Sequence, residues 1–281
     1  MKISVLGLGL IGAAWAKNLI DDGHEVRCWN RTPKDFPHFE PDAARATAGA
    51  DAVFLVVADP PAVQAVLDLV LPALRPGQLV IQASTISAEW TRAFAAQVEK
   101  TGARFLEAPF TGSKPAAEAR QTVFYLGGAE ETVAQARPFL EPLSKTILHI
   151  GPLGSASSLK LAMNLNIAGV AEALCESLAL SRAAGISDDV YFGALAQNVS
   201  QSGVAQLKQP KLRAADYAPQ FSLKHMGKDL RLALETAASL SLPLEHTAHL
   251  RSLYERGLAA GWGEDDFIGL MRLLDKGAKR D

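Results

Sequence analysis

Lys160 and Asn164 have the residue types and the spacing of a pair that moves a proton. Four positions separate them, so in a helix they would lie on one face. Lys160 comes near the expected start of its helix, where the macrodipole disfavours a positive charge, and burial would act in the same direction. We therefore expect a lysine whose pKa falls towards the range of a general acid or base. From the spacing alone, a lysine that extends along the helix surface into solvent remains the alternative.

A glycine-rich turn near the start of the chain has the pattern of a phosphate-binding loop. Its six residues are Gly7, Leu8, Gly9, Leu10, Ile11 and Gly12. They follow an apolar run and precede an amphipathic stretch, which is the strand–turn–helix context that a dinucleotide fingerprint requires. The first glycine permits the tight turn, the second lets the backbone approach a pyrophosphate, and the third allows close packing of helix on strand. The start of the helix adds unpaired N–H groups and the positive end of its dipole.

Three polar residues, Asn30, Arg31 and Thr32, end the second expected strand. A site selective for NAD usually has Asp or Glu here, because a carboxylate bonds the ribose 2′-hydroxyl. The chain has an amide instead, and the guanidinium beside it suits charge-assisted bonds to a 2′-phosphate, to which Thr32 adds a hydroxyl. We therefore predict NADP (NADPH) as the cofactor in preference to NAD. The alternative is that Arg31 is a solvated loop residue.

Two further loops follow strand ends, where ligands bind in open α/β sheets. Val57 and Ala58 come after the third expected strand, and Thr85 comes after the fourth. The hydroxyl of Thr85 is placed to bond the nicotinamide-side ribose or amide. Taken alone, either loop would more often be an ordinary turn or a helix cap.

The loop after the fifth expected strand has the composition of a carboxylate-binding turn. It contains Thr111, Gly112 and Ser113, and exposed N–H groups in such a turn bind anions. We expect the carboxylate of a small-molecule substrate there, and we expect the bulky Phe110 to narrow the pocket. Taken alone, the loop would more often be a plain turn.

Neither a metal site nor a disulfide framework is predicted. His246 and His249 are three positions apart, but no third ligand accompanies them in the sequence. Cys28 and Cys175 are the two cysteines. Cys175 lies among apolar residues, which is more typical of a buried small hydrophobe than of a nucleophile.

The order of β-rich and helical runs predicts an α/β fold for the first half of the chain. Strands are expected at residues 2–6, 25–29, 52–57, 79–83, 104–108, 122–127 and 145–150. Helices are expected between them at residues 11–21, 61–70, 87–100 and 130–141. Several strands are apolar on both faces, as in a parallel sheet covered by helices on either side. We predict a Rossmann-type, doubly wound sheet over residues 1–152, which binds the NADP.

The pattern changes after residue 151, beyond which no convincing strand follows. Helices are expected at residues 155–184, 188–197, 222–240 and 246–260, with a last one after residue 265. The first is apolar on most faces, which indicates a buried helix. We predict an all-helical domain over residues 153–281 that contacts substrate and forms a homodimer or homotetramer.

Composition and charge exclude several classes of protein. The chain has 281 residues, of which 48% are hydrophobic and 21% charged, as in ordinary globular proteins. Its 28 basic and 30 acidic residues give a net charge of −2, which argues against a general nucleic-acid binder. No apolar stretch is long enough to predict a membrane span, and no secretory signal is evident, so we expect a cytoplasmic protein without membrane partners.

Taken together, four motifs identify a resemblance over nearly the whole chain. They are GLGLIG at the start, EAPFTGSKP in the middle, KLAMN at the domain junction and FSLKHMGKDL around residue 225. The chain resembles the β-hydroxyacid dehydrogenase family, which includes 3-hydroxyisobutyrate, tartronate semialdehyde and 6-phosphogluconate dehydrogenases. Its motifs are most similar to the glyoxylate and succinic semialdehyde reductases, which use NADPH to reduce small aldehyde acids.

The resemblance implies a role for each matching residue. Lys160 would be the catalytic lysine and Asn164 its supporting asparagine, while the loop around Gly112 would bind the substrate carboxylate. Lys228 would contact both cofactor and substrate. The implied reaction transfers a hydride between the nicotinamide and a small aldehyde or keto acid, or the corresponding hydroxy acid. Two alternatives stay open: an imine reductase of the same architecture, which generally lacks the lysine, and a dinucleotide-binding protein without turnover.

Overall fold

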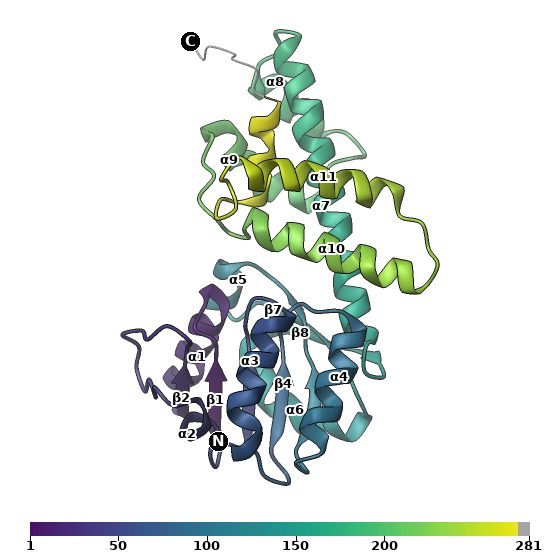
Figure 1. The fold of residues 1–281 in the computed structure, drawn as a ribbon. Coiled ribbons are helices and arrows are strands. Elements are labelled where there is room, and N and C mark those ends of the chain that lie inside the picture. Colours follow the sequence, from purple (N-terminus) through teal and green to yellow (C-terminus); the bar gives the residue numbers. More distant parts are fainter. Residues whose placement is uncertain (275–281) are drawn as a thin grey trace. The chain divides into compact units, whose positions relative to one another are not determined.

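The computed structural model describes residues 1–274 and divides the chain into two compact units (Figure 1). The first unit is Met1–Leu161 and the second begins at Ala162. The division therefore falls inside a helix, two turns after that helix begins at Ser155. The boundary at residues 152 and 153 is a prediction from the loss of strand pattern, and it stays one.

Within the first unit, which the structure describes in full, eight strands form one sheet (Figure 1). They are β1 (Lys2–Leu6), β2 (Glu25–Trp29), β3 (Ala52–Leu55), β4 (Leu79–Gln82), β5 (Arg104–Glu107), β6 (Phe110–Thr111), β7 (Thr122–Gly127) and β8 (Ser144–Gly151). The order is β2-β1-β3-β4-β5-β7-β6, and β8 pairs with β7. Strands β2, β1, β3, β4 and β5 are mutually parallel, whereas β7 runs antiparallel to β5. The chain reverses its direction across the sheet between β1 and β3, and ligands bind at such switch points.

Helices cover both faces of this sheet, as predicted from strands whose side chains are apolar on both faces. One core contains side chains of α1 (Leu10–Asp21), α5 (Lys114–Glu118) and α6 (Glu130–Leu140). The other contains side chains of α2 (Ala43–Thr47), α3 (Pro60–Val70) and α4 (Ala88–Glu99). Alternate residues of each strand enter the two cores: Val5 belongs to the first and Leu6 to the second. The Rossmann-type doubly wound domain is thereby confirmed.

Local signals set where the helices over the carboxyl edge of the sheet begin. Asp59 caps α3 by accepting the N–H of Ala62 at 2.9 Å, and Pro60 occupies the first helical position. Ser87 caps α4 in the same way. Because of these caps, the loops after β3 and β4 are only a few residues long. The loops therefore remain at the carboxyl edge of the sheet, where ligands bind in such folds.

The second unit is built of helices within the described residues. They are α7 (Ser155–Ala183, shared with the first unit), α8 (Asp188–Ala196), α9 (Gly203–Ala214), α10 (Leu223–Ser239), α11 (Glu245–Ala259) and the 3₁₀ helix η3 (Phe267–Leu273). One apolar core draws on these elements, with Leu178, Leu230 and Tyr254 fully buried in it. The prediction of an all-helical second half is confirmed for this part of the chain. No helix in the described part is long and apolar enough to span a membrane.

Hydrophobic periodicity in the sequence does not reveal the shortest strands and helices. Strand β6 and helices α2, α5 and α9 were not predicted, and the last expected helix is a 3₁₀ helix. Strand β6 has two residues and α2 and α5 have five each, so none completes a hydrophobic period. Helix α9 contains Pro210, and proline is unfavourable inside a helix, so its sequence gives a weak helical signal.

Candidate active site

The glycine turn after β1 has a conformation that only glycine accommodates. Gly7 has φ +112°, and a Cβ there would lie 2.2 Å from the carbonyl oxygen of Val56 at the end of β3. A Cβ on Gly12 would lie 1.9 Å from the carbonyl oxygen of Gly7, so this glycine allows α1 to pack closely on the turn. A Cβ on Gly9, by contrast, would meet nothing within 4 Å. The open side of the turn is therefore at Gly9, where a ligand can reach the backbone.

Helix α1 starts at Leu10 with Gly9 as its N-cap, and no side chain caps it. The amides of the first turn are thus directed to the open side of the glycine turn, together with the positive end of the helix dipole. This arrangement fits a dinucleotide pyrophosphate.

Asn30 connects the end of β2 to the glycine turn. Its side-chain oxygen accepts the N–H of Leu8 at 3.0 Å, and its amide group donates to the carbonyl of Thr32 at 2.8 Å. The amide therefore fixes two backbone segments, a role that the sequence did not reveal. Arg31 and Thr32 are exposed beside it, as a contact with a ligand phosphate requires.

Lys34 is a further cation in the loop after β2, and we did not predict it as a site residue. Its Nζ donates to the carbonyl of Leu8 at 2.5 Å, which brings an ammonium group over the glycine turn. A second basic residue three positions after Arg31 was the available signal. Arg31 and Lys34 thus add two positive charges at the end of β2, where Lys34 contacts the glycine turn.

The loops after β3 and β4 are joined by a serine. Ser84 Oγ accepts the N–H of Val57 at 2.8 Å, so the two loops keep a fixed separation at the carboxyl edge of the sheet. Ala58 is exposed and Thr85 half-buried at this edge. The structure thus brings these predicted residues to the same edge as the glycine turn, because β1, β3 and β4 are parallel neighbours.

The expected carboxylate loop leaves β5 through the short strand β6 and enters α5. Gly112 has φ +131°, and Ser113 is the N-cap residue of α5. Thr111 and Ser113 are half-buried and Gly112 is exposed. The ring of Phe110 packs edge-on against Trp15 of α1, with centroids 4.8 Å apart. One face of this half-buried ring therefore packs on the core beside α1. That Phe110 also narrows a substrate pocket stays a prediction.

Lys160 belongs to the first unit and Asn164 to the second, one turn further along α7. Both are buried, with 8% and 3% exposure. Asn164 Nδ2 donates to Asp229 Oδ2 at 2.5 Å, and Lys228 Nζ lies 2.9 Å from Asp229 Oδ1. The buried carboxylate of Asp229 thus connects two of the predicted residues within the second unit. Its importance was not evident from the sequence, where it is simply the neighbour of Lys228.

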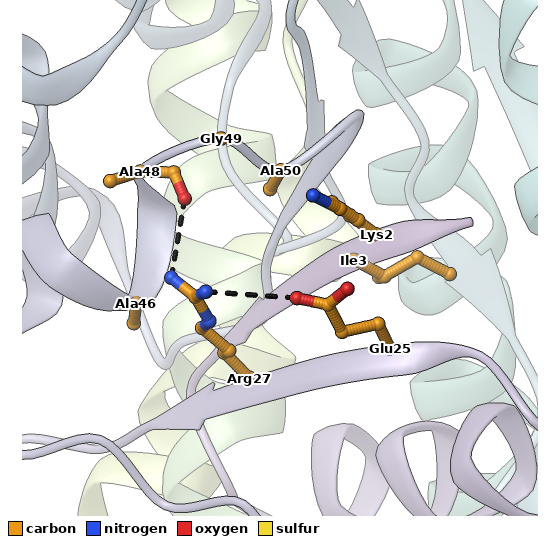
Figure 2. A pocket seen from close by; sticks show the side chains of 8 residues that line it. All are labelled: Lys2, Ile3, Glu25, Arg27, Ala46, Ala48, Gly49 and Ala50. Carbon is orange, nitrogen blue, oxygen red and sulfur yellow. Dashed lines mark hydrogen bonds and ion pairs between the residues drawn. The ribbon is translucent and has the colours of Figure 1, made fainter.

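A small pocket is lined by residues of β1 and β2 and by the segment after α2 (Figure 2). Since Lys2 and Glu25 begin their strands and the glycine turn follows the end of β1, the pocket lies at the opposite edge of the sheet. There Arg27 donates to the carbonyl of Ala48 at 3.3 Å and pairs with Glu25 at 3.6 Å. These contacts satisfy Arg27 locally, and we assign no ligand to the pocket. Among residues 1–274, no three His, Cys, Asp or Glu side chains are grouped to hold a metal ion.

Two family models match the chain. Residues 2–151 match the NAD-binding domain of 6-phosphogluconate dehydrogenase, and residues 154–274 match the NAD-binding domain of NADP-dependent 3-hydroxyisobutyrate dehydrogenase.

The chain is also similar to individual proteins and solved structures. The chain is 29% identical to the chloroplastic glyoxylate/succinic semialdehyde reductase 2 of Arabidopsis thaliana, over 100% of this chain and 81% of that protein. A structure of 3-hydroxyisobutyrate dehydrogenase from Mycobacterium tuberculosis with L-serine superposes with a TM-score of 0.88 at 29% identity, covering 98% of this chain and 99% of that one. A Streptomyces aurantiacus imine reductase superposes with a TM-score of 0.66 at 20% identity, covering 98% and 100%, which shows a common fold alone.

Proposed function

The chain belongs to the NAD(P)-dependent hydroxyacid dehydrogenase family of 3-hydroxyisobutyrate dehydrogenase, and we propose that it uses NADPH to reduce a short aldehyde or keto acid. As a member of this family it is an oxidoreductase that acts on CH–OH groups with a nicotinamide cofactor. Glyoxylate and succinic semialdehyde are the substrate types we favour, because the chain is 29% identical to a reductase named for them. The observation that carries the proposal is a buried lysine, Lys160, on a helix that starts beside the dinucleotide-binding sheet.

The cofactor would be held at the edge formed by the loops after β1, β2, β3 and β4. When bound, its nicotinamide supplies the hydride that reduces the substrate carbonyl. We propose that the Gly9 turn binds the pyrophosphate, that Arg31, Thr32 and Lys34 select the 2′-phosphate, and that Thr85 contacts the nicotinamide side. Asn30 supports this selection indirectly, because it joins the backbone of Thr32, which follows Arg31, to the backbone of Leu8 in the glycine turn.

Arg31→Ala is expected to weaken NADPH binding much more than NADH binding. A charge-assisted contact to phosphate is worth about 1.5–3 kcal/mol, so the Kd for NADPH should rise roughly 10- to 150-fold. The Kd for NADH, which has no 2′-phosphate, should change by less than about threefold, since the lost contact does not exist for it. Titrations that follow nicotinamide fluorescence would measure both constants.

Arg27→Ala is the matched control for this experiment, because it removes the same charge from the opposite edge of the sheet (Figure 2). It should leave both dissociation constants unchanged. Equal kcat/KM values of the wild type for NADPH and NADH would contradict the assignment of NADPH.

We propose that the substrate carboxylate binds at the loop of Thr111, Gly112 and Ser113. The loop offers hydroxyls and a glycine backbone whose N–H groups can bond a carboxylate. A contact of Lys228 with the substrate stays an expectation from the family resemblance. Replacing the free acid by its methyl ester should then reduce kcat/KM by roughly 10- to 150-fold, because a charge-assisted contact is lost. An ester that reacts as well as the acid would show that the carboxylate is not recognised.

Lys160 is proposed to supply the proton. As hydride reaches the carbonyl carbon, negative charge develops on the carbonyl oxygen, and an ammonium group can hydrogen-bond that oxygen and protonate it. In oxidation the neutral amine would remove the proton from the hydroxyl group. Asn164, on the same face of α7 and bonded to Asp229, would hold the reacting oxygen or the lysine in line.

An imine reductase activity is the second candidate, supported by the shared fold of the Streptomyces enzyme. The two candidates are distinguished by measuring NADPH oxidation with glyoxylate, succinic semialdehyde and a cyclic imine. Turnover of the imine alone would favour the second candidate.

We also propose that the chain forms a homodimer or homotetramer through its second unit. Large apolar side chains are exposed there, including Leu180 at 73% and Val190 at 62%. Apolar side chains that stay exposed on one domain can be covered by a second copy of the chain. Sedimentation velocity at micromolar concentration should therefore show a species larger than 29.9 kDa, and a monomer would contradict the proposal.

A further inference from the structure

A buried carboxylate holds the start of α7. Glu107, the last residue of β5, has no solvent exposure. Its Oε1 accepts the N–H groups of Gly154 at 2.6 Å and Ala156 at 3.1 Å. Its Oε2 accepts the N–H of Ser157 at 3.1 Å and the hydroxyl of Ser157 at 2.5 Å. Four donors therefore converge on one side chain that comes from a strand far away in the sequence.

This carboxylate takes the place of a local helix cap. The first amides of a helix have no partner within it, and a short polar residue at the N-cap usually accepts one of them. In α7 the N–H of Ser155 bonds the carbonyl of Pro152, and Glu107 takes those of Gly154, Ala156 and Ser157. The negative charge also lies at the positive end of the helix dipole, where it is favourable.

The surrounding residues make room for Glu107 and orient its partners. A Cβ on Gly127, its register partner in β7, would lie 1.9 Å from Oε1, so only glycine fits opposite. Thr91 of α4 lies 2.8 Å from the hydroxyl of Ser157. Because Ser157 donates its hydroxyl proton to Glu107, Thr91 must donate to Ser157. The hydrogen bonds of Glu107, and the contact between Ser157 and Thr91, therefore all lie within the first unit.

Glu107 lies between two parts of the proposed active site. Downstream of it, the chain runs directly into Thr111, Gly112 and Ser113, the proposed carboxylate loop. Across from it, Ala156 and Ser157 precede Lys160 by four and three positions, so they share its face of α7. One side chain therefore connects the base of the substrate loop to the turn of helix that carries the lysine.

We propose that Glu107 is a positioning residue, which holds the first turn of α7 and thereby places Lys160 in register with the substrate loop. The inference rests on the proposed function, because it requires Lys160 to act on the substrate. A displacement of about 1 Å between reacting groups can cost roughly 100-fold in rate. Loss of the carboxylate should therefore affect kcat in particular, since the substrate loop and the glycine turn keep their own attachments to the sheet.

Glu107→Gln tests the proposal with little change in volume. Its amide group would face the N–H of Ser157, so one donor loses its acceptor. We expect kcat to fall roughly 10- to 100-fold, while the KM for the substrate and the Kd for NADPH change by less than about threefold. In the protein without ligands, hydrogen exchange at the amides of Gly154, Ala156 and Ser157 should become faster. Ser157→Ala, which removes one of the four donors, should lower kcat by a smaller factor, about 3- to 10-fold.

Glu130→Gln is the matched control, because Glu130 is an exposed carboxylate in the first turn of α6. It should leave kcat unchanged. A double-mutant cycle then separates positioning from general damage: in a Lys160→Met background, Glu107→Gln should change the residual kcat by less than about twofold.

Two outcomes would overturn the inference. One is a Glu107→Gln enzyme that retains the kcat of the wild type. The other is a Glu107→Gln change that lowers kcat by the same factor in the wild-type and in the Lys160→Met background. The proposed function is tested separately, by whether the wild type reduces an aldehyde acid with NADPH at all. If the wild type is active and the cycle is additive, the proposed function stands and the positioning role of Glu107 fails.

Discussion

Lys160→Met is expected to fold normally, to bind NADPH with near wild-type affinity and to lose at least about 100-fold in kcat. Methionine has a similar length and keeps the packing of the buried stem, but it has no proton to give. General acid–base catalysis is typically worth about 10²- to 10⁴-fold, and this contribution would be removed. The dinucleotide-binding loops belong to other elements, so NADPH binding should be retained.

Arginine at position 160 should fail to rescue the activity, because its pKa is too high for it to exchange a proton. Lys145→Met is the control, since Lys145 is an exposed lysine on β8 in the same unit. The measurement is kcat for reduction under conditions where chemistry limits the rate, with NADPH binding and circular dichroism recorded in parallel. A Met variant that kept more than about a tenth of wild-type kcat would show that the proton comes from elsewhere. The imine-reductase reading would then gain support.

The dinucleotide-binding half was predictable because its signals are local. A glycine turn between an apolar strand and an amphipathic helix specifies both the backbone and the ligand, and Gly7 and Gly12 have the close contacts that the motif implies. Parallel strands then bring their carboxyl-end loops to one edge whatever the loop sequences are. This is why Val57 and Thr85 could be placed near the glycine turn without any knowledge of their side-chain contacts.

The site residues that could not be predicted make hydrogen bonds to residues far away in the sequence. Glu107 bonds amides that begin 47 positions later, and Asp229 accepts from Asn164 across 65 positions. Neither contact has a periodicity or a spacing that a reader could recognise, because tertiary packing alone brings the partners together. The contacts of Asn30 were hidden for a related reason: its two hydrogen bonds are to backbone groups, which its residue type does not reveal. Its part in cofactor selection stays a prediction.

A second case of this kind is the ion pair in the core of the second unit. Lys208 of α9 and Asp266, the N-cap of η3, are 1% and 0% exposed, and Lys208 Nζ lies 2.8 Å from Asp266 Oδ1. The same ammonium donates to Gln220 at 3.1 Å and lies 4.5 Å from the ring centroid of Phe267. Burial lowers the pKa of Lys208, and the carboxylate of Asp266 opposes that effect. The pair thus joins α9, η3 and the segment before α10, and these contacts offset part of its cost of desolvation.

Lys208→Met is therefore expected to destabilise the second unit by about 3–5 kcal/mol, because it leaves the carboxylate of Asp266 buried without its cation. Urea unfolding followed by far-ultraviolet circular dichroism would measure the shift, since the second unit is built largely of helices. The solvent-accessible pair Arg251–Glu255, in which Arg251 is half-buried and Glu255 exposed, provides the control. The two residues are one turn apart on α11, and Arg251→Met should cost only about 0.3–0.5 kcal/mol. If the two variants were equally stable, the buried pair would contribute no more than a surface one. The link between α9 and η3 would then depend on the apolar contacts around Phe267 instead.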